Sequence, residues 1–268
     1  MNLLFAFACM AGIFTIAQSF IQASIFDFYF YLLPFGLSLA AVCIAAGLKH
    51  LSVFRPIRPH MGQSFVPFGV FGALAMLASV ALCVYGPSLR MPWFALMLVI
   101  VQLAAYVSFW SAIVQGGRLA ASLAGFAVGL MLGYLLVTTL DLDPLVILSM
   151  AVACTLALCV AHYFSKGAEW VVYVLVVGLA AFGVFHAKQF DLTPHSMGWM
   201  MDYGKAGATD TGERKARRWG PAGLMEMYAL SSDERAAWLY TNGASPGLVL
   251  LDRPATYDDA RSEERRVG

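Results

Sequence analysis

The chain has 268 residues, of which 60% are hydrophobic and 12% are charged, and its mean hydropathy is +0.72. A soluble globular domain carries about twice this charged fraction, so the composition excludes an ordinary soluble domain. The formal net charge of +1 gives no basis for binding nucleic acid. Because the apolar residues lie in blocks long enough to cross a bilayer, the sequence predicts a multi-pass protein of the cell (inner) membrane, with the lipid bilayer as its partner.

Seven apolar blocks predict seven transmembrane helices. No basic segment or cleavage site marks the first block as a signal peptide, so we expect it to be a retained span. Pro34 in the second block predicts a kink. Residues 1–187 are therefore expected to form an all-α polytopic membrane bundle. The predicted spans cover residues 2–24, 28–47, 65–85, 93–114, 118–140, 145–164 and 170–186.

The fifth predicted span carries a small residue at every fourth position, namely Ala121, Gly125, Gly129 and Gly133. This spacing places all four on one face of a helix. Small side chains let the backbone of a neighbouring helix approach closely. The pattern therefore predicts that these four residues are helix-packing residues, and that this span is the central helix around which the others pack. The acidic segment 140–144 ends the helix, because its proline cannot continue it.

The interiors of the predicted spans contain no Asp, Glu, Lys or Arg. This counts against a pump or a proton-coupled carrier, because such proteins bind charge inside the bilayer. The strongest polar groups at membrane depth are Gln18, Gln22, Gln102 and His162. We expect the three glutamines to form hydrogen bonds across helices, and His162 to be partnered or interfacial rather than a ligand.

All five cysteines lie in apolar blocks, and none forms a C-x-x-C pair or a metal-ligand spacing with histidine. This pattern favours small apolar packing residues over redox or metal chemistry. The sequence therefore predicts no metal site and no cofactor in this chain. The residues concerned are Cys9, Cys43, Cys83, Cys154 and Cys159.

Basic residues in the loops indicate the orientation of the bundle. Five of them fall on one side if the spans alternate, namely Lys49, Arg55, Arg58, Arg118 and Lys166. Among the loops between spans, only Arg90 opposes them. That side is predicted to be cytoplasmic, with the N-terminus inside. Seven spans place the C-terminal tail outside, but Lys188 and a basic cluster at 214–218 favour the opposite orientation, so the side of the membrane on which the tail lies stays open.

The composition changes after residue 187, and the tail is polar. Residues 188–218 are predicted to be a linker with a solvated basic cluster, and 219–260 to be the start of a soluble β-stranded region. A short β-meander is expected, with strands at 223–230, 236–241 and 248–251 and a tight turn at Asn242-Gly243. The alternative for 231–239 is a helix that begins with a capping box at Ser231.

The tail carries a resemblance to a known family. It begins with Arg218-Trp219-Gly220-Pro221 and continues with a strand, a turn and Trp238-Leu239-Tyr240-Thr241-Asn242-Gly243. After a block of membrane spans and a basic linker, this arrangement resembles the membrane-fused members of the spermidine synthase-like (polyamine aminopropyltransferase) family, over roughly residues 217–251. Family members often have Asp-Gly where this chain has Asn-Gly, and either pair suits a tight turn.

The resemblance implies that a Rossmann-like, methyltransferase-type catalytic domain follows the β-stranded region in the full-length parent. A polyamine and decarboxylated S-adenosylmethionine would be partners of that parent only. Its chemistry needs a glycine-rich strand-to-helix turn and carboxylates that bind the polyamine. No such turn follows Leu251, and Asp258 and Asp259 come too early. No catalytic residue is therefore assigned to this chain, although the parent is expected to be a transferase or a transferase-like protein.

The last eight residues, 261–268, resemble the translation of a sequencing adapter, so we expect an artefact and a reading frame cut near Ala260. The alternative is an ordinary charged terminus. The first functional hypothesis is therefore the membrane-anchoring N-terminal part of a spermidine synthase-like protein, truncated before its catalytic domain. A small-solute transporter and a non-catalytic membrane scaffold subunit are the alternatives.

Overall fold

The computed structural model describes residues 3–25, 31–50, 61–85, 91–116, 119–164, 178, 211–221, 223–230, 236–241 and 244–250. Six helices lie in this part of the chain: α1 (Leu3–Ile25), α2 (Leu33–His50), α3 (Met61–Tyr85), α4 (Met91–Gly116), α5 (Leu119–Thr138) and α6 (Pro144–Phe164). They occupy six of the seven predicted ranges. The seventh range, 170–186, lies outside the described residues apart from Gly178.

Three of these helices are long and apolar enough, by length and composition, to cross a membrane. Their apolar segments are Leu4–Ser24 in α1, Ala95–Val114 in α4 and Ala120–Thr138 in α5. The other three helices contain shorter apolar segments. The described residues thus form a helical bundle suited to a membrane, with three candidate spans rather than the predicted seven.

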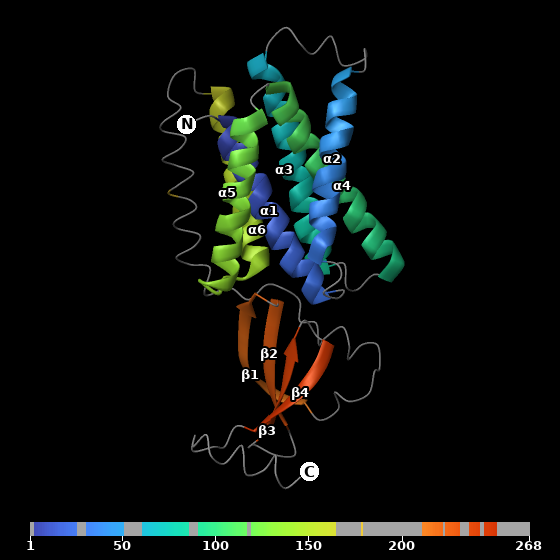
Figure 1. Cartoon of the computed structure of the whole chain (residues 1–268), viewed down its shortest axis with the longest axis vertical. Coiled ribbons are helices and arrows are strands. Elements are labelled where there is room, and N and C mark those ends of the chain that lie inside the picture. The colour runs from blue at the N-terminus through green and yellow to red at the C-terminus, as the bar shows by residue number, and fades with distance from the viewer. Residues whose placement is uncertain are drawn as a thin grey trace.

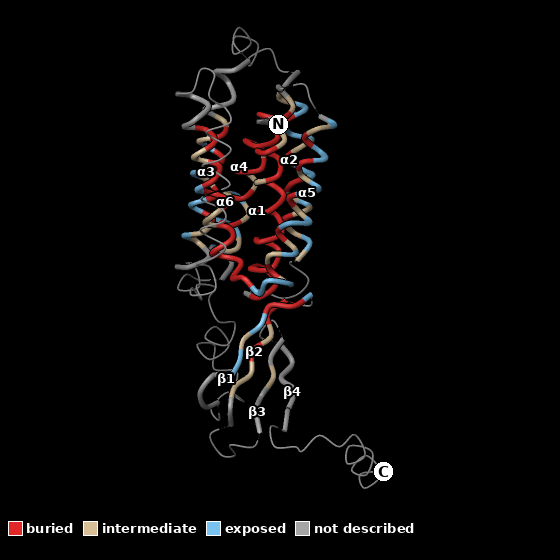
Figure 2. Tube along the Cα trace, turned by 90° about the vertical axis from the view of Figure 1, so that its left-hand side faces the viewer, coloured by how far each residue is buried: buried red, intermediate tan, exposed pale blue. Residues whose placement is uncertain are grey.

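The innermost helix of the bundle is α1, and the prediction that α5 is central is wrong. In the apolar segment of α1, 83% of the residues are buried, against 28% in that of α5. Figure 2 shows α1 as a buried core element, whereas α5 alternates between buried and exposed positions. The glycine spacing identifies the face of α5 that meets another helix, but it says nothing about how many helices surround α5.

The outer faces of α2 to α5 carry large exposed apolar side chains, among them Leu39, Leu74, Ile100 and Met131. An apolar surface that extends over several helices is unusual for a soluble protein and suits contact with lipid. On α2, Pro34 is the second residue of the helix. The predicted kink is therefore wrong, because proline in the first turn removes no intrahelical hydrogen bond and begins the helix instead.

The tail forms a four-stranded antiparallel sheet at one end of the bundle (Figure 1). Its strands are β1 (Thr211–Gly220), β2 (Gly223–Leu230), β3 (Ala236–Thr241) and β4 (Ala244–Leu250), paired in sequence order. The register places Arg217 opposite Glu226 and Trp219 opposite Leu224. Consecutive strands thus form a meander, as the turn signals indicate.

Three expectations for the tail differ from the structure. The first strand, β1, lies mostly in the range predicted to be a linker, because its charged residues hide the strand pattern. The last strand, β4, begins at Ala244, four residues before the predicted start at 248. The alternative helix at 231–239 is excluded where the structure describes it, since Ala236 begins β3. The predicted turn at Asn242-Gly243 lies outside the described residues.

Candidate functional site

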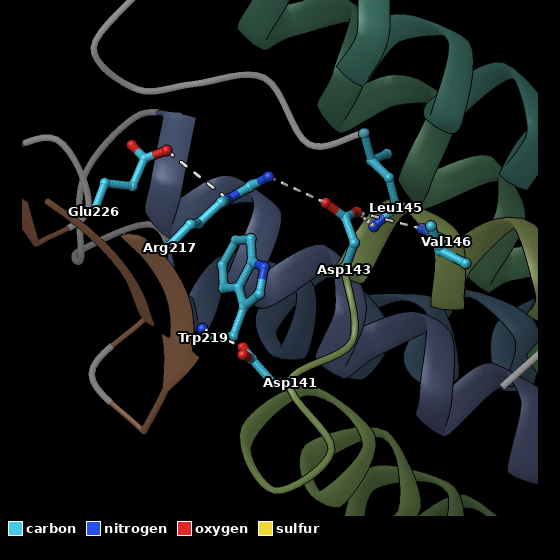
Figure 3. Close-up of polar contacts among 7 residues, drawn as sticks. All are labelled: Asp141, Asp143, Leu145, Val146, Arg217, Trp219 and Glu226. Carbon is cyan, nitrogen blue, oxygen red and sulfur yellow. Dashed lines mark hydrogen bonds and ion pairs between the residues drawn. The ribbon is translucent and has the colours of Figure 1, made fainter. Parts of the chain in front are cut away.

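The junction between the bundle and the sheet is the most elaborate polar site in the described residues (Figure 3). It is built on the turn between α5 and α6. The backbone N–H of Leu142 donates to the carbonyl oxygen of Leu136 at 3.1 Å, and this hydrogen bond closes the turn that follows α5. Asp141 has a φ of 56°, a left-handed conformation that aspartate tolerates better than most residues. Asp141 and Asp143 are thereby both presented at the end of the bundle that faces the sheet.

Asp143 caps α6 and also faces the sheet. Its Oδ1 accepts hydrogen bonds from the backbone N–H groups of Leu145 at 2.8 Å and Val146 at 3.4 Å. These N–H groups lack partners inside the helix, so a carboxylate at the N-cap stabilises the start of α6. Its Oδ2 lies 3.6 Å from the Arg217 guanidinium on β1. One carboxylate therefore serves a helix cap and an ion pair to the sheet.

Arg217 connects the two parts of the fold. Its side chain is 10% exposed, and its Nε lies 3.8 Å from Oε1 of Glu226 on β2, whose side chain is 1% exposed. Burial lowers the pKa of Arg217, while Asp143 and Glu226 oppose that shift. The guanidinium also lies over the Trp219 ring, 5.5 Å from its centroid, in cation–π geometry. The prediction that the whole cluster at 214–218 is solvated is wrong for this residue.

Trp219 is the apolar anchor of the junction. It is 3% exposed and belongs to the same hydrophobic cluster as α1. Its ring meets Phe20 of α1 edge-on, with 6.1 Å between the centroids. Its backbone N–H donates to Asp141 Oδ1 at 2.7 Å. A tryptophan in this position buries a large apolar area while its backbone is fixed by the bundle.

Three of the four predicted helix-packing residues lie against the backbone of α1. A Cβ placed on Gly129 would lie 2.8 Å from the carbonyl carbon of Cys9, and one on Gly125 would lie 3.1 Å from that of Phe5. A Cβ on Gly133 would meet Ile13 Cα at 3.2 Å. Ala121 is half-buried.

The approach is reciprocal, because Gly12 of α1 faces α5, where its Cβ would lie 2.7 Å from the Leu130 nitrogen. Only glycine allows two helix backbones to come this close.

A chain of buried amides joins α1, α3 and α4, and it confirms the prediction for the three glutamines. Gln22 Nε2 donates to Gln102 Oε1 at 2.7 Å, and Gln102 Nε2 donates to Gln18 Oε1 at 2.7 Å. Gln18 Nε2 donates to Ser79 Oγ at 2.6 Å. All four side chains are completely buried. Within the described residues, Gln22 Oε1 has no hydrogen-bond partner.

The remaining candidates form no site among the described residues. Cys9, Cys154 and Cys159 are buried, whereas Cys43 is exposed on α2. His162 belongs to α6, and its side chain lies outside the described residues. In the described ranges, no group of three or more His, Cys, Asp or Glu side chains is arranged to hold a metal ion.

The sequence did not predict the junction, because its only signal is the spacing of residues within each half. Arg217 and Trp219 are two residues apart, as are Asp141 and Asp143. Alternate residues of a strand share a face, so Arg217 and Trp219 point the same way.

Comparison of the chain with protein-family models, with curated proteins and with solved structures gave no match.

Proposed function

We propose that this chain is the membrane-anchoring part of a larger protein and that it holds a β-stranded module in a fixed position at the membrane surface. The observation that carries the proposal is the burial of Trp219 and Glu226 at the junction, together with the Arg217–Asp143 ion pair. A flexibly tethered module would not bury a tryptophan and an ion pair against its anchor, because both require a persistent interface.

In the proposed topology, each of α1 to α6 crosses the membrane, including α2, α3 and α6 with their shorter apolar segments, and the chain after α6 crosses it once more. The end of α6 and the start of β1 belong to opposite ends of the bundle, because Asp143 at the start of α6 contacts the sheet and α6 then runs away from it. If the bundle spans the bilayer, the chain between Phe164 and Thr211 has to cross it an odd number of times. The apolar block 170–186 has the length and composition for one crossing.

We also propose that the parent protein is spermidine synthase-like, with its transferase domain beyond the sheet. The resemblance in 217–251 supports this, and the meander is compatible with the small β-stranded region that the family places before its catalytic domain. A longer natural reading frame should then continue into a glycine-rich strand-to-helix turn followed by an acidic residue. A genuine stop codon after Gly268, with no adapter sequence, would remove this part of the proposal.

The anchoring function is tested with the chain in native membranes. Alkaline carbonate washing should leave the protein in the membrane pellet, and protease should cut the junction slowly. Replacing Arg217 by methionine should expose the junction to protease without releasing the protein from the membrane. Release by carbonate would contradict the membrane anchor, and rapid cleavage of the unaltered junction would contradict fixed positioning.

Transport of a small polar solute is a second candidate, because Gln22 Oε1 offers a buried acceptor with no partner among the described residues. A liposome flux assay with polyamines and other small solutes would test it. Flux that is lost in a Gln22→Leu variant would favour transport over anchoring. The absence of flux for every solute would contradict the transport function.

A further inference from the structure

We infer that the β-sheet, and any chain attached to it, lies on the non-cytoplasmic side of the membrane. The inference rests on the proposed function, because it requires the bundle to cross the bilayer. The charges of the loops do not decide on which side of the membrane the tail lies, because the tail has basic residues of its own. The contacts of the sheet now show which loops share its end of the bundle.

Three parts of the bundle lie at the sheet. The last turns of α1 lie there because Phe20 packs against Trp219 of β1. Tyr31, just before α2, packs on Phe20 with 5.5 Å between the ring centroids, so α2 begins at the same end. The α5–α6 turn lies there because Asp141 accepts a hydrogen bond from Trp219.

The starts of α1, α3 and α5 and the ends of α2, α4 and α6 lie at the opposite end, which Figure 1 shows beside the N-terminus. Near the start of α1, Phe7 packs against Phe109, late in α4, with 4.6 Å between the ring centroids. A Cβ on Gly69, early in α3, would lie 3.4 Å from Phe7 and would also collide with Cys159, late in α6. Gly125, early in α5, faces the start of α1. The ends of α2, α4 and α6 and the starts of α3 and α5 therefore share the end remote from the sheet.

The basic residues of the short connections are concentrated at the remote end. The last turn of α2, the α2–α3 and α4–α5 connections and the residues just after α6 supply Lys49, Arg55, Arg58, Arg118 and Lys166. At the sheet end, the sequences 26–32, 86–90 and 139–143 contain Arg90 as their single Lys or Arg, and Lys188 directly follows the proposed crossing at 170–186. Short connections rich in Lys and Arg stay in the cytoplasm, so the remote end is cytoplasmic and the sheet is outside.

The opposing basic cluster at 214–218 does not outweigh this asymmetry. Its residues belong to the folded strand β1, well beyond the roughly 15–20 residues from a span within which charge governs orientation. Folded domains are translocated largely regardless of their charge. Arg217, in addition, is paired with Asp143 and Glu226. The consequence is functional: a catalytic or binding domain that follows β4 meets the substrates and partners of the non-cytoplasmic compartment.

Cysteine accessibility tests the inference directly. Ala216 is exposed on β1, and Ser52 lies in the connection between α2 and α3, so Ala216→Cys and Ser52→Cys report the two ends of the bundle. A membrane-impermeant maleimide is applied to right-side-out spheroplasts and to sealed inverted vesicles. The unaltered protein measures the background from native cysteines. The A216C variant should take up label in spheroplasts and lose it in inverted vesicles, and S52C should show the reverse.

The outcomes separate the inference from the proposed function. Labelling of A216C in inverted vesicles alone would overturn the orientation and leave the anchor intact. Labelling of both variants from the same side would overturn the alternating topology. Release of the protein by alkaline carbonate would contradict the membrane anchor itself. If A216C does not accumulate, Arg218→Cys, at another exposed position of β1, replaces it with the same expected pattern.

Discussion

Arg217 lies between two buried carboxylates that belong to different parts of the molecule, Asp143 on the α5–α6 turn and Glu226 on β2. Replacing Arg217 by methionine keeps most of the side-chain volume and removes the charge. Both carboxylates would then be buried without their cation, which costs about 3–5 kcal/mol when one partner of a buried pair is lost. We expect the sheet to detach from the bundle, measured as faster limited proteolysis near the junction.

Arg218→Met is the matched control for this variant, because Arg218 is the next residue and is exposed. It should leave proteolysis unchanged. A double variant, R217M/E226Q, should recover part of the lost resistance, since it removes one of the two stranded charges. Equal protease resistance of R217M and R218M would show that the ion pairs do not hold the sheet.

Asp141 supplies the acceptor for the Trp219 backbone N–H and adopts a left-handed conformation. Asp141→Ala removes the acceptor and places alanine in a conformation that it disfavours, with an expected loss of about 1–3 kcal/mol. Asp141→Asn keeps both an acceptor oxygen and the tolerance for this conformation. Hydrogen exchange at the Trp219 amide should therefore accelerate much more in D141A than in D141N. Slow exchange in both variants would contradict the assigned contact.

At the scale of elements, the tightest helix pair is α1 with α5, whose backbones meet at Gly129 and Gly12. Gly129→Ala adds a methyl group where backbone atoms already lie, and overpacking of this kind costs about 1–3 kcal/mol. The matched control is Gly36→Ala on α2, where an added Cβ meets nothing within 4 Å. Thermal unfolding in detergent should show a lower Tm for G129A only. A G129A variant as stable as G36A would refute the close contact.

The amide chain joins three helices, so its central member should matter most. Gln102→Leu removes two interhelical hydrogen bonds and leaves Gln18 and Gln22 short of partners, with an expected loss of about 1 kcal/mol or more. Ser149→Ala is the control, because the Ser149 hydroxyl donates to Leu145 within its own helix. Chemical denaturation in detergent compares the two. A larger effect for S149A would contradict a structural role for the chain.

Most elements were predictable from local sequence patterns. Six of the seven predicted apolar blocks correspond to α1 to α6, and the bounds of β2 and β3 coincide with the predicted ranges. The strand β1 was missed because its charged residues resemble a linker, whereas its pairing with β2 supplies the missing stability. The central position of α1 was missed because helix periodicity reports a contact face and not the number of neighbours.

For the whole molecule, the junction could not be read from local patterns. Asp141 and Trp219 are far apart in the sequence, and no periodicity links them. The ion pair between Asp143 and Arg217 depends on how the bundle and the sheet pack together, and a local sequence pattern does not contain that information. The glutamines, in contrast, were predictable because a buried amide in an apolar helix needs a partner from another helix.

The central claim is that the bundle holds the sheet in one fixed position. Double electron–electron resonance between spin labels tests it in lipid nanodiscs, with labels on Leu135→Cys, on the exposed face of α5, and Ala216→Cys on β1, after replacement of the native cysteines by alanine. The account predicts a single narrow distance distribution that broadens when Arg217 is also replaced by methionine. A broad distribution in the presence of Arg217 would contradict it.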